Sequence, residues 1–497
     1  MRPLLCLLAL LSVCSHAAPL HFRVQDSNGK LIACRIHLVD ASGQPQFAVD
    51  LPKWHDHFVC GGTAKLNLPA GRYQYEIERG PEHATSVGEV EVKPSGASVT
   101  VTLKRIASLA ADGWFSGDLH IHRPLKDIPL LILAEDLHIA PVITWWNNRN
   151  LWKDQPVPAN LLGELPGPRF IHVMTGEDER EGGALLYFHL PKPLDITGAT
   201  REFPPPMKFL AAARQHSGTW VDIEKPFWWD VPVWLASGLC DSIGLANNHM
   251  CRSSVYPSEA WGRPRDTQRL PAPLGNGHWT QEIYYHLLNC GLRLPPSAGS
   301  ASGVLPNPVG YNRVYVKTTG PLTWDQWWRG LKAGHCFVTN GPLLRVRANK
   351  QWPGTILKME NGKLALQLVI QLTTKDRIQA LEVIHNGVIA KKIPCADKLH
   401  QTIHAQMELT DNGWFLLRAL TEKKNTFRFA STGPFYLEPG PTRISRRSAK
   451  FFLDWIHERQ ARVPRKLKDP SKLREVLAHH QRAERFWRQK LTQANAE

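Results

Sequence analysis

Apolar and polar residues alternate one by one along the first part of the chain. The pattern runs through the stretches LHFRVQDSNGKLIACRIHLVD, TAKLNLPAGRYQYEIERG and ASVTVTLKR. A period of two is typical of strands with one buried face, and the Gly-containing breaks between the stretches indicate turns. We therefore predict a β-sandwich of about seven strands over residues 18–109.

The pattern then changes to an alternation of strand-like and helix-like segments. PLLILAEDLHIA is helical and leads into a buried strand, PVITWW, while TWDQWWRGLKAG is a helix closed by Gly334. RFIHVMTGED and GTWVDIEKP are further strands, and both end in polar residues. This order is typical of a barrel-like α/β domain whose site gathers at the carboxyl ends of the strands. We predict this domain over residues 110–342.

Strand-like alternation returns in LALQLVIQL, ALEVIHNGVIA and GWFLLRAL, which predicts a second β-sandwich over residues 343–441. Residues 442–497 form a basic tail with helical periodicity. Apolar residues three and four apart, including Phe452, Trp455 and Ile456, share one face. Asp469 and Pro470 start a second segment that carries Leu473, Leu477 and Trp487. We predict two helices within residues 445–492.

The N-terminus has the pattern of a secretory signal. Arg2 precedes a short apolar run, LLCLLALLSV, and the small residues of SHA follow. This pattern predicts a signal peptide over residues 1–17 and a secreted or periplasmic protein. No later stretch reaches about 18 apolar residues, so we expect no transmembrane segment in the mature chain.

Composition and charge narrow the function. The chain of 497 residues is 43% hydrophobic and 21% charged, which excludes a largely disordered protein. Residues 441–497 hold 15 Lys/Arg against 6 Asp/Glu, so over half of the net charge of +16 lies in the tail. The tail is therefore a candidate for binding an anionic surface. The alternative is that its helices dock on the chain's own β-domain. Nucleic acid is not an expected partner of an exported protein.

The stretch GWFSGDLHIHR carries the strongest chemical signal. On a strand, residues two apart point to the same face, so Asp118, His120 and His122 share one side. Two neutral imidazoles placed in this way can bind a divalent metal, and a carboxylate can complete or orient the set. The alternative is a pair of half-exposed histidines without a ligand.

The motif GDLHIH at the start of the α/β region resembles the first motif of the PHP (polymerase and histidinol phosphatase) superfamily. YYHLLNCGLRLPPSAGS and WWRGLKAGHCFVTNGPLL are similar to segments of its CehA/McbA branch, and the likeness spans about Trp114 to Gly354. The resemblance implies a distorted (β/α)7 barrel with up to three metal ions. It also implies hydrolysis of a phosphoester or, in this branch, of a carbamate or other ester. LPAGRYQYEIERG in turn resembles transthyretin-like or carboxypeptidase-regulatory accessory domains.

The family's ligands carry over only in part. His120 and His122 match the metal-binding pair, Asp127 falls where the family often places a ligand or near-ligand, and Glu177 matches the bridging glutamate. The other motifs depart: Thr-Asp-His, His-Pro and Gly-Ser-Asp-x-His are replaced by Thr144-Trp145-Trp146, Lys225-Pro226 and Gly299–Gly303. We therefore expect one divalent metal, which would be Zn, Mn or Fe.

Several residues could rebuild the altered site. His249 is a candidate third imidazole, with a hydrogen-bonded pocket histidine as the alternative. Lys225 is a candidate base or charge stabiliser, or else an ion-pair partner of Glu224 or Asp222. Asp127 is the other candidate for proton transfer. Asp178 should point away from the face of Glu177.

The remaining candidates concern the substrate. Trp145, Trp146, Asn147 and Asn248 lie at predicted strand ends and are candidates for substrate binding, although Trp also packs in cores and lids. GSASG does not match a nucleophile elbow, because Ala301 occupies the central position.

The sequence thus favours a metal-dependent hydrolase of PHP type acting on an ester, carbamate or phosphoester of a small molecule or glycan. The alternative is a non-catalytic binding protein on a degenerate PHP scaffold that recognises a glycan or an anionic surface.

Overall fold

The computed structural model describes residues 17–438 and 442–497, which form two compact units. The first unit holds residues 17–79 and 83–105, and the second holds residues 80–82 with the chain from Ile106 onward. The expected signal peptide lies outside the described residues except for Ala17, which opens the first strand.

The first unit consists of two sheets that share one apolar core. One sheet has the order β5 (Thr63–Pro69), β1 (Ala17–Gln25), β8 (Ala97–Thr102). The other has the order β3 (Lys53–Trp54), β4 (His57–Cys60), β2 (Cys34–Asp40), β6 (Gly71–Glu78), β7 (Ser86–Val92). Alternate side chains such as Leu20 and Phe22 from one sheet meet Ile36 and Phe58 from the other, as the period of two requires.

The second unit is built on a mixed sheet. Parallel strands β9 (Trp114–Gly117), β10 (Ile139–Trp146) and β13 (Arg169–Arg180) are followed by β14 (Gly183–Phe188), which is antiparallel to both of its neighbours. Parallel pairing then joins β15 (Trp220–Ile223), β16 (Ser242–Ala246) and β17 (Pro296–Ala298). The short strands β11 (Arg149–Asn150) and β12 (Leu162–Leu165) lie between β10 and β13 in the chain. The expected mixed α/β class is confirmed.

This sheet closes on itself through the segment that follows β9. Ile121 forms parallel bridges to Val142 on one side and to Ser302 on the other. The N–H groups of Leu119 and His122 donate to the carbonyls of Ala298 and Ser302. The histidine motif therefore lies at the seam where the first and last strands of the closed sheet meet.

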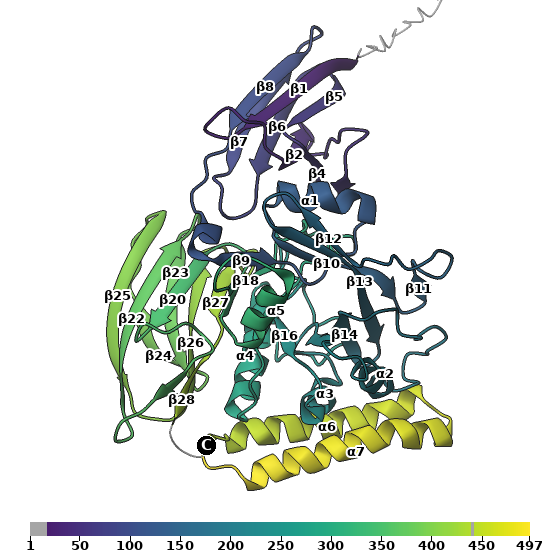
Figure 1. The fold of residues 1–497 in the computed structure, drawn as a ribbon, viewed down its shortest axis with the longest axis vertical. Coiled ribbons are helices and arrows are strands. Elements are labelled where there is room, and N and C mark those ends of the chain that lie inside the picture. The colour runs from purple at the N-terminus through teal and green to yellow at the C-terminus, as the bar shows by residue number, and fades with distance from the viewer. Residues whose placement is uncertain (1–16, 439–441) are drawn as a thin grey trace, which may run out of the picture. The chain divides into compact units, whose positions relative to one another are not determined.

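Helices follow most of these strands along the chain (Figure 1). They are the 3₁₀ segments η1 (Leu109–Asp112) and η2 (Leu125–Asp127), and the α-helices α1 (Ile128–Ala134), α2 (Pro206–Ala213), α3 (Val231–Ser237), α4 (Gly275–Asn289) and α5 (Trp324–Lys332). The helix expected over residues 129–140 is shorter than predicted. It ends at Ala134 because Asp136 adopts a left-handed φ of 51° and the chain then enters β10.

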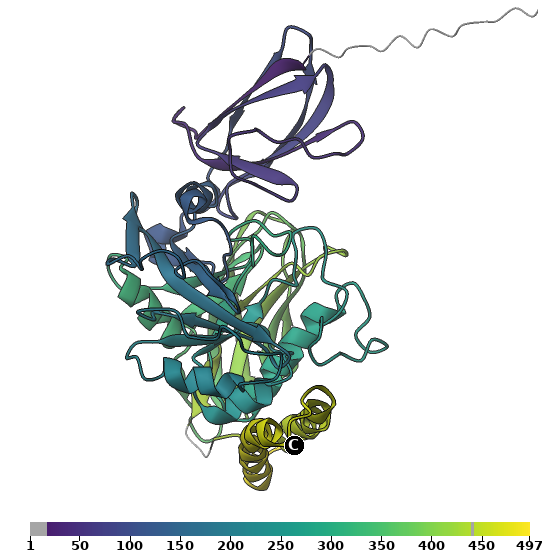
Figure 2. The same cartoon turned by 90° about the vertical axis from the view of Figure 1, so that its right-hand side faces the viewer.

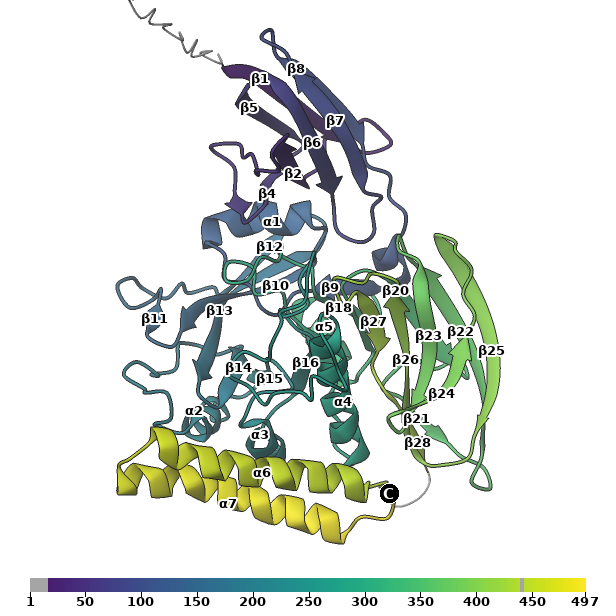
Figure 3. The same ribbon diagram turned by 180° about the vertical axis from the view of Figure 1, so that it is seen from behind.

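The second β-region extends the same sheet. Strands β18 (Arg313–Lys317) and β19 (Cys336–Thr339) pair with β9 and β27. A separate sheet, β20 (Leu343–Ala348), β22 (Leu364–Thr373) and β25 (His400–Leu409), packs through one apolar core on the remaining strands (Figure 3). Those strands are β21 (Ile356–Lys358), β23 (Ile378–His385), β24 (Val388–Ile393), β26 (Gly413–Thr421), β27 (Phe429–Thr432) and β28 (Phe435–Glu438).

The C-terminal helices are confirmed. Helices α6 (Arg446–Lys466) and α7 (Pro470–Thr492) run side by side below α2 and α3, as Figures 1 and 2 show. We call this pair the C-terminal hairpin. Asp469 begins α7 by accepting hydrogen bonds from the N–H groups of Ser471 and Lys472. Within the described ranges, no helix is long and apolar enough to cross a membrane.

Candidate metal centre

The segment after β9 is held in place by Asp118. Its carboxylate is fully buried and accepts hydrogen bonds from the N–H groups of His120, Ser300 and Gly310 at 3.0, 3.0 and 2.6 Å. Asp118 therefore fixes the backbone that carries the histidines and does not itself point at their ring nitrogens. Burial raises the pKa of Asp118, although these N–H donors act against the rise.

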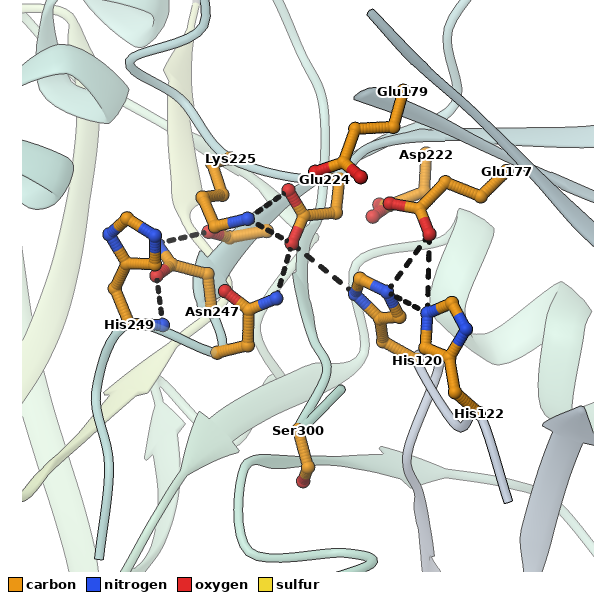
Figure 4. A network of polar contacts seen from close by, with 12 residues as sticks. His120, His122, Glu177, Glu179, Asp222, Glu224, Lys225, Asn247, His249 and Ser300 are labelled. Carbon is orange, nitrogen blue, oxygen red and sulfur yellow. Dashed lines mark hydrogen bonds and ion pairs between the residues drawn. The ribbon is translucent and has the colours of Figure 1, made fainter. Parts of the chain in front are cut away.

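His120, His122 and Glu177 converge on one point (Figure 4). The two Nε2 atoms lie 2.9 Å apart, and Glu177 Oε2 lies 3.4 Å from His120 Nε2 and 3.2 Å from His122 Nε2. A triangle of this size leaves a position about 2 Å from all three atoms, which is the bond length of Zn to nitrogen or oxygen. Glu177 Oε2 is buried and has no well-aligned hydrogen-bond donor among the described residues. The group could therefore hold a metal ion.

Two glycines make room for these histidines. A Cβ atom at Gly299 would lie 2.4 Å from His120 Cβ, and one at Gly303 would lie 2.4 Å from the carbonyl oxygen of His122. Gly303 also has a φ of 102°, which disfavours other residues. The glycines of the GSASG stretch thus allow its backbone to pass close to His120 and His122.

Strand β13 separates two adjacent acids. Glu177 points toward the imidazoles, and Asp178 points to the other face, where it forms an ion pair with Arg180 at 2.5 and 2.8 Å. Glu179, two residues beyond Glu177, returns to the face of the site and accepts a hydrogen bond from Trp146 Nε1 at 3.0 Å. Glu177 and Glu179 thus lie on one face of β13 and Asp178 on the other, as strand alternation predicts.

Glu224 is a candidate site residue that sequence reasoning missed. Its Oε1 lies 3.3 Å from His120 Nδ1, so it faces the ring nitrogen that points away from the triangle. The same carboxylate accepts hydrogen bonds from Lys225 Nζ, Trp228 Nε1 and Asn248 Nδ2. A carboxylate behind a ligating imidazole fixes its tautomer and raises its basicity. The available signal was Asp222-x-Glu224 at the end of β15, the same spacing as Glu177-x-Glu179.

The carboxylates of Glu177 and Glu224 favour a positive charge at the site. Burial alone would lower the pKa of His120, but Glu177 and Glu224 outweigh it and raise the pKa to about 10. The pKa of Glu177 is lowered despite its burial, because of the charge on His120. The pKa of His122 is lowered, since burial outweighs Glu177. Without metal a proton supplies the charge, and a bound cation would replace it.

Two further carboxyls near the group carry raised pKa values. Burial, with the nearby charge of Glu177, raises the pKa of Glu179 to about 7. Burial also raises the pKa of Asp222 to about 7, although hydroxyls of Ser242 and Ser297 donate to it.

The other predicted ligand and proton-transfer residues lie around this group. Lys225 is buried, pairs with Glu224 and lies over the ring of Trp228 at 4.6 Å, which is the ion-pair alternative. His249 lies on the far side of Glu224 and Lys225 from the triangle (Figure 4) and stacks on Tyr256 at 4.5 Å. Burial lowers the pKa of His249 well below its usual value. Asp127 ends η2, half-buried, and lies outside the group of converging ligand atoms.

The predicted substrate-binding residues divide into two kinds. Trp146 is partly exposed, and its ring lies 4.9 Å from that of His122. Trp145 is buried against Tyr187, so its ring is not available for stacking. The Asn147 side chain exchanges two hydrogen bonds with the backbone of Glu179, both at 2.8 Å, and Asn248 contacts Glu224. These asparagines support the acids of the site.

A second group with the same residue types occurs in the first unit. His37, Asp56 and His57 also bring possible ligand atoms together. Asp56 Oδ2 lies 3.3 Å from His37 Nδ1, and Asp56 Oδ1 lies 3.0 Å from His57 Nδ1. Here the outer neighbour is a cation, because Arg35 Nε donates to His37 Nε2 at 3.0 Å.

Comparison with known proteins adds little to this geometry. No protein-family model matches the chain, and no curated protein matches it. Among solved structures, the Bacillus anthracis TIE protein is similar at 20% identity over 22% of this chain and 20% of its own, with a TM-score of 0.15. The chain thus spans about a fifth of that protein, and the likeness is too slight to carry an argument.

Proposed function

We propose that the chain is a metal-dependent hydrolase of PHP type that holds one divalent ion on His120, His122 and Glu177. The observation that carries the proposal is the convergence of their three ligand atoms, backed by Glu224 behind His120. The closed sheet with the inverted strand β14 supports the distorted (β/α)7 barrel that the family resemblance implies.

The donor set favours catalysis over a structural role. Structural zinc sites are closed by four protein ligands, whereas catalytic sites use three and keep a position for water or substrate. This group contributes three donors among the described residues. An ion bound there would lower the pKa of its water toward about 7 and polarise the scissile group.

The residues around the triangle have separate tasks in this proposal. Glu224 holds His120 in the tautomer that presents Nε2, and Lys225 neutralises Glu224. Trp146 and His122 form the partly exposed wall that a substrate would contact. We propose an ester, carbamate or phosphoester of a small molecule or glycan as substrate, and a secreted or periplasmic location.

The test uses the neighbouring acids on β13 as a matched pair. Full-length protein should carry close to one equivalent of Zn, Mn or Fe and cleave at least one of 4-nitrophenyl acetate, a 4-nitrophenyl carbamate or 4-nitrophenyl phosphate. Glu177→Gln should lose metal and activity together, while Asp178→Asn should keep the metal. Protein that stays metal-free after addition of Zn, Mn and Fe would refute the proposal.

A second candidate function is binding without catalysis, through the C-terminal hairpin. Exposed cations gather at the turn between its helices, namely Arg465, Lys466, Lys468, Lys472 and Arg474. Such a cluster attracts anionic polysaccharide or lipid. Changing the five to Gln should sharply reduce salt-sensitive retention on heparin. A metal-free wild-type protein that is retained in this way would favour the binding protein.

A further inference from the structure

The segment from Glu224 to Pro232 joins the metal centre to helix α3. Its first residue lies behind His120, and its Trp228 returns to donate from Nε1 to Glu224 Oε2 at 2.9 Å. The position of this segment therefore decides where the Glu224 carboxylate lies. We call residues 224–232 the Glu224 segment.

The far end of the Glu224 segment is fixed by a buried charge cluster. Arg459 of α6 is 1% exposed and donates from Nε to Asp230 Oδ1 at 2.7 Å. Its Nη atoms also bind both oxygens of Glu202 at 2.9 and 2.6 Å. His480 of α7 lies 3.3 Å from the same oxygen of Asp230. Both helices of the C-terminal hairpin thus converge on Asp230.

Further contacts from the hairpin hold the same segment. Trp487 Nε1 donates to the carbonyl of Pro232 at 2.9 Å. The guanidinium of Arg462 lies over the ring of Trp229 at 4.2 Å. Because these contacts reach three successive parts of the segment's end, they fix its position and not only its general packing.

Asp230 also touches the strand that carries Glu177. Its N–H donates to the carbonyl of Gly182 at 2.8 Å, at the turn between β13 and β14. A Cβ atom at Gly182 would lie 2.0 Å from the Asp230 carboxylate, so the two segments approach each other too closely for a side chain at residue 182. Asp230 therefore ties the Glu224 segment to the turn that follows the strand of Glu177.

Apolar contacts already hold the hairpin on the rest of the second unit, so the buried charge cluster is not needed for packing. The hairpin already buries Phe452, Trp455 and Trp487 in the same core as Trp228 and Trp234. Burying ionic groups usually adds little net stability over apolar residues of similar volume, whereas it demands one particular arrangement. Such a cluster fixes the register of the hairpin on the Glu224 segment.

We propose that the C-terminal hairpin positions the metal centre, with Arg459 and Asp230 as positioning residues that act through Glu224. This inference rests on the proposed function, because it concerns the ion held by His120, His122 and Glu177. Neither positioning residue touches the triangle; each sets where the carboxylate behind His120 lies.

The experiment measures Co²⁺ binding to the full chain by titration and by its visible spectrum. Asp230→Asn and Arg459→Lys should each weaken Co²⁺ binding by about 10-fold and shift the absorption bands, because the support of His120 is displaced. Arg488→Gln, which removes an exposed pair with Glu484 on α7, is the matched control and should change neither. Trp487→Phe keeps an aromatic ring, removes one hydrogen bond and leaves a small cavity; it should shift the bands in the same direction by less.

A double-variant cycle separates positioning from general destabilisation. In a Glu224→Gln background, Asp230→Asn should cause little further loss, because the path to His120 is already broken. Asp230→Asn and Trp487→Phe proteins that fold, as judged by circular dichroism, with wild-type Co²⁺ affinity and spectrum would overturn the inference. So would an undiminished effect in the Glu224→Gln background. Wild-type protein that binds no Co²⁺, Zn²⁺, Mn²⁺ or Fe²⁺ would instead refute the proposed function, and the inference with it.

Discussion

The two units contain the same three residue types in similar arrangements, with opposite outer neighbours. His120, His122 and Glu177 have the Glu224 carboxylate behind one imidazole. In the first unit, the nearest neighbour of His37 Nε2 is the guanidinium of Arg35, which itself pairs with Glu78 at 2.5 Å. Because the residue types are the same, any difference in metal binding between the two groups must come from the residues around them.

The neighbours decide which ring nitrogen carries the proton. Arg35 Nε can only donate, so His37 Nε2 must accept and its proton lies on Nδ1, facing Asp56. That proton occupies the lone pair that a metal would need. Glu224 can only accept when ionised, so it favours a proton on His120 Nδ1 and leaves Nε2 free for a ligand bond. The group in the first unit is therefore better suited to hydrogen bonding than to metal binding.

The largest difference is expected when the imidazoles of each group are removed. His120→Ala with His122→Ala should lower Zn²⁺ affinity on the order of 1,000-fold, because two of three ligands are lost. His37→Ala with His57→Ala should leave the wild-type stoichiometry. Isothermal titration of chelator-treated full-length protein measures both, and zinc lost only from the second double variant would reverse the comparison.

Exchanging the outer neighbours should produce a smaller effect. Glu224→Gln should weaken Zn²⁺ binding by about 10- to 100-fold. In protein that lacks both His120 and His122, Arg35→Met should create weak Zn²⁺ binding at His37 and His57, because Nδ1 can then lose its proton. Arg35→Lys keeps a donor and serves as the control. No binding in the Arg35→Met protein would show that the guanidinium is not what excludes the metal.

In metal-free protein, the contributions of His57 and His120 to the free energy of unfolding should change with pH in opposite directions. Burial lowers the pKa of His57 to about 3, so its contribution to stability is complete above about pH 6.5 and is lost as the pH falls toward 3. His120 has a raised pKa of about 10, so its contribution is complete below about pH 6.5 and is lost as the pH rises toward 10. Each slope approaches about 1.4 kcal/mol per pH unit.

Thermal unfolding of variants against wild type tests these signs. His57→Phe should gain stability relative to wild type as the pH falls, and His120→Phe should gain it as the pH rises. Chelator is present throughout, since bound metal would mask the second effect. Parallel curves for the two variants would contradict the assigned neighbours.

The smallest effect is expected at Asp127, which lies outside both groups. Asp127→Asn should change Zn²⁺ affinity by no more than about twofold, because its carboxylate does not join the converging ligands. The catalytic role expected for Asp127 stays a prediction, and the turnover number of the zinc-loaded variant checks it. A large loss of metal instead would place Asp127 among the ligands.

Local periodicity in the sequence determined several features. The alternation of DLHIH puts His120 and His122 on one face, and the alternation of β13 separates Glu177 from Asp178. The spacing of apolar residues predicts both helices of the C-terminal hairpin. These features depend on neighbours within a few residues, so a single chain carries enough information to predict them.

Only the tertiary structure decided which distant residues surround each imidazole. Closure of the sheet brings Glu224 to His120, which lies about a hundred residues earlier in the chain. Arg35, by contrast, lies two residues before His37 on β2, so strand alternation alone puts it beside that imidazole. The sequence suggested Glu224 only as a partner for Lys225. It left His249 either a third ligand or a hydrogen-bonded pocket histidine, and that histidine lies across Glu224 from the triangle. Contacts over long separations are set by how sheets close and pack, so no local pattern in the sequence encodes the carboxylate that lies behind His120. In the proposed site, that carboxylate favours the tautomer of His120 whose Nε2 could bind a metal.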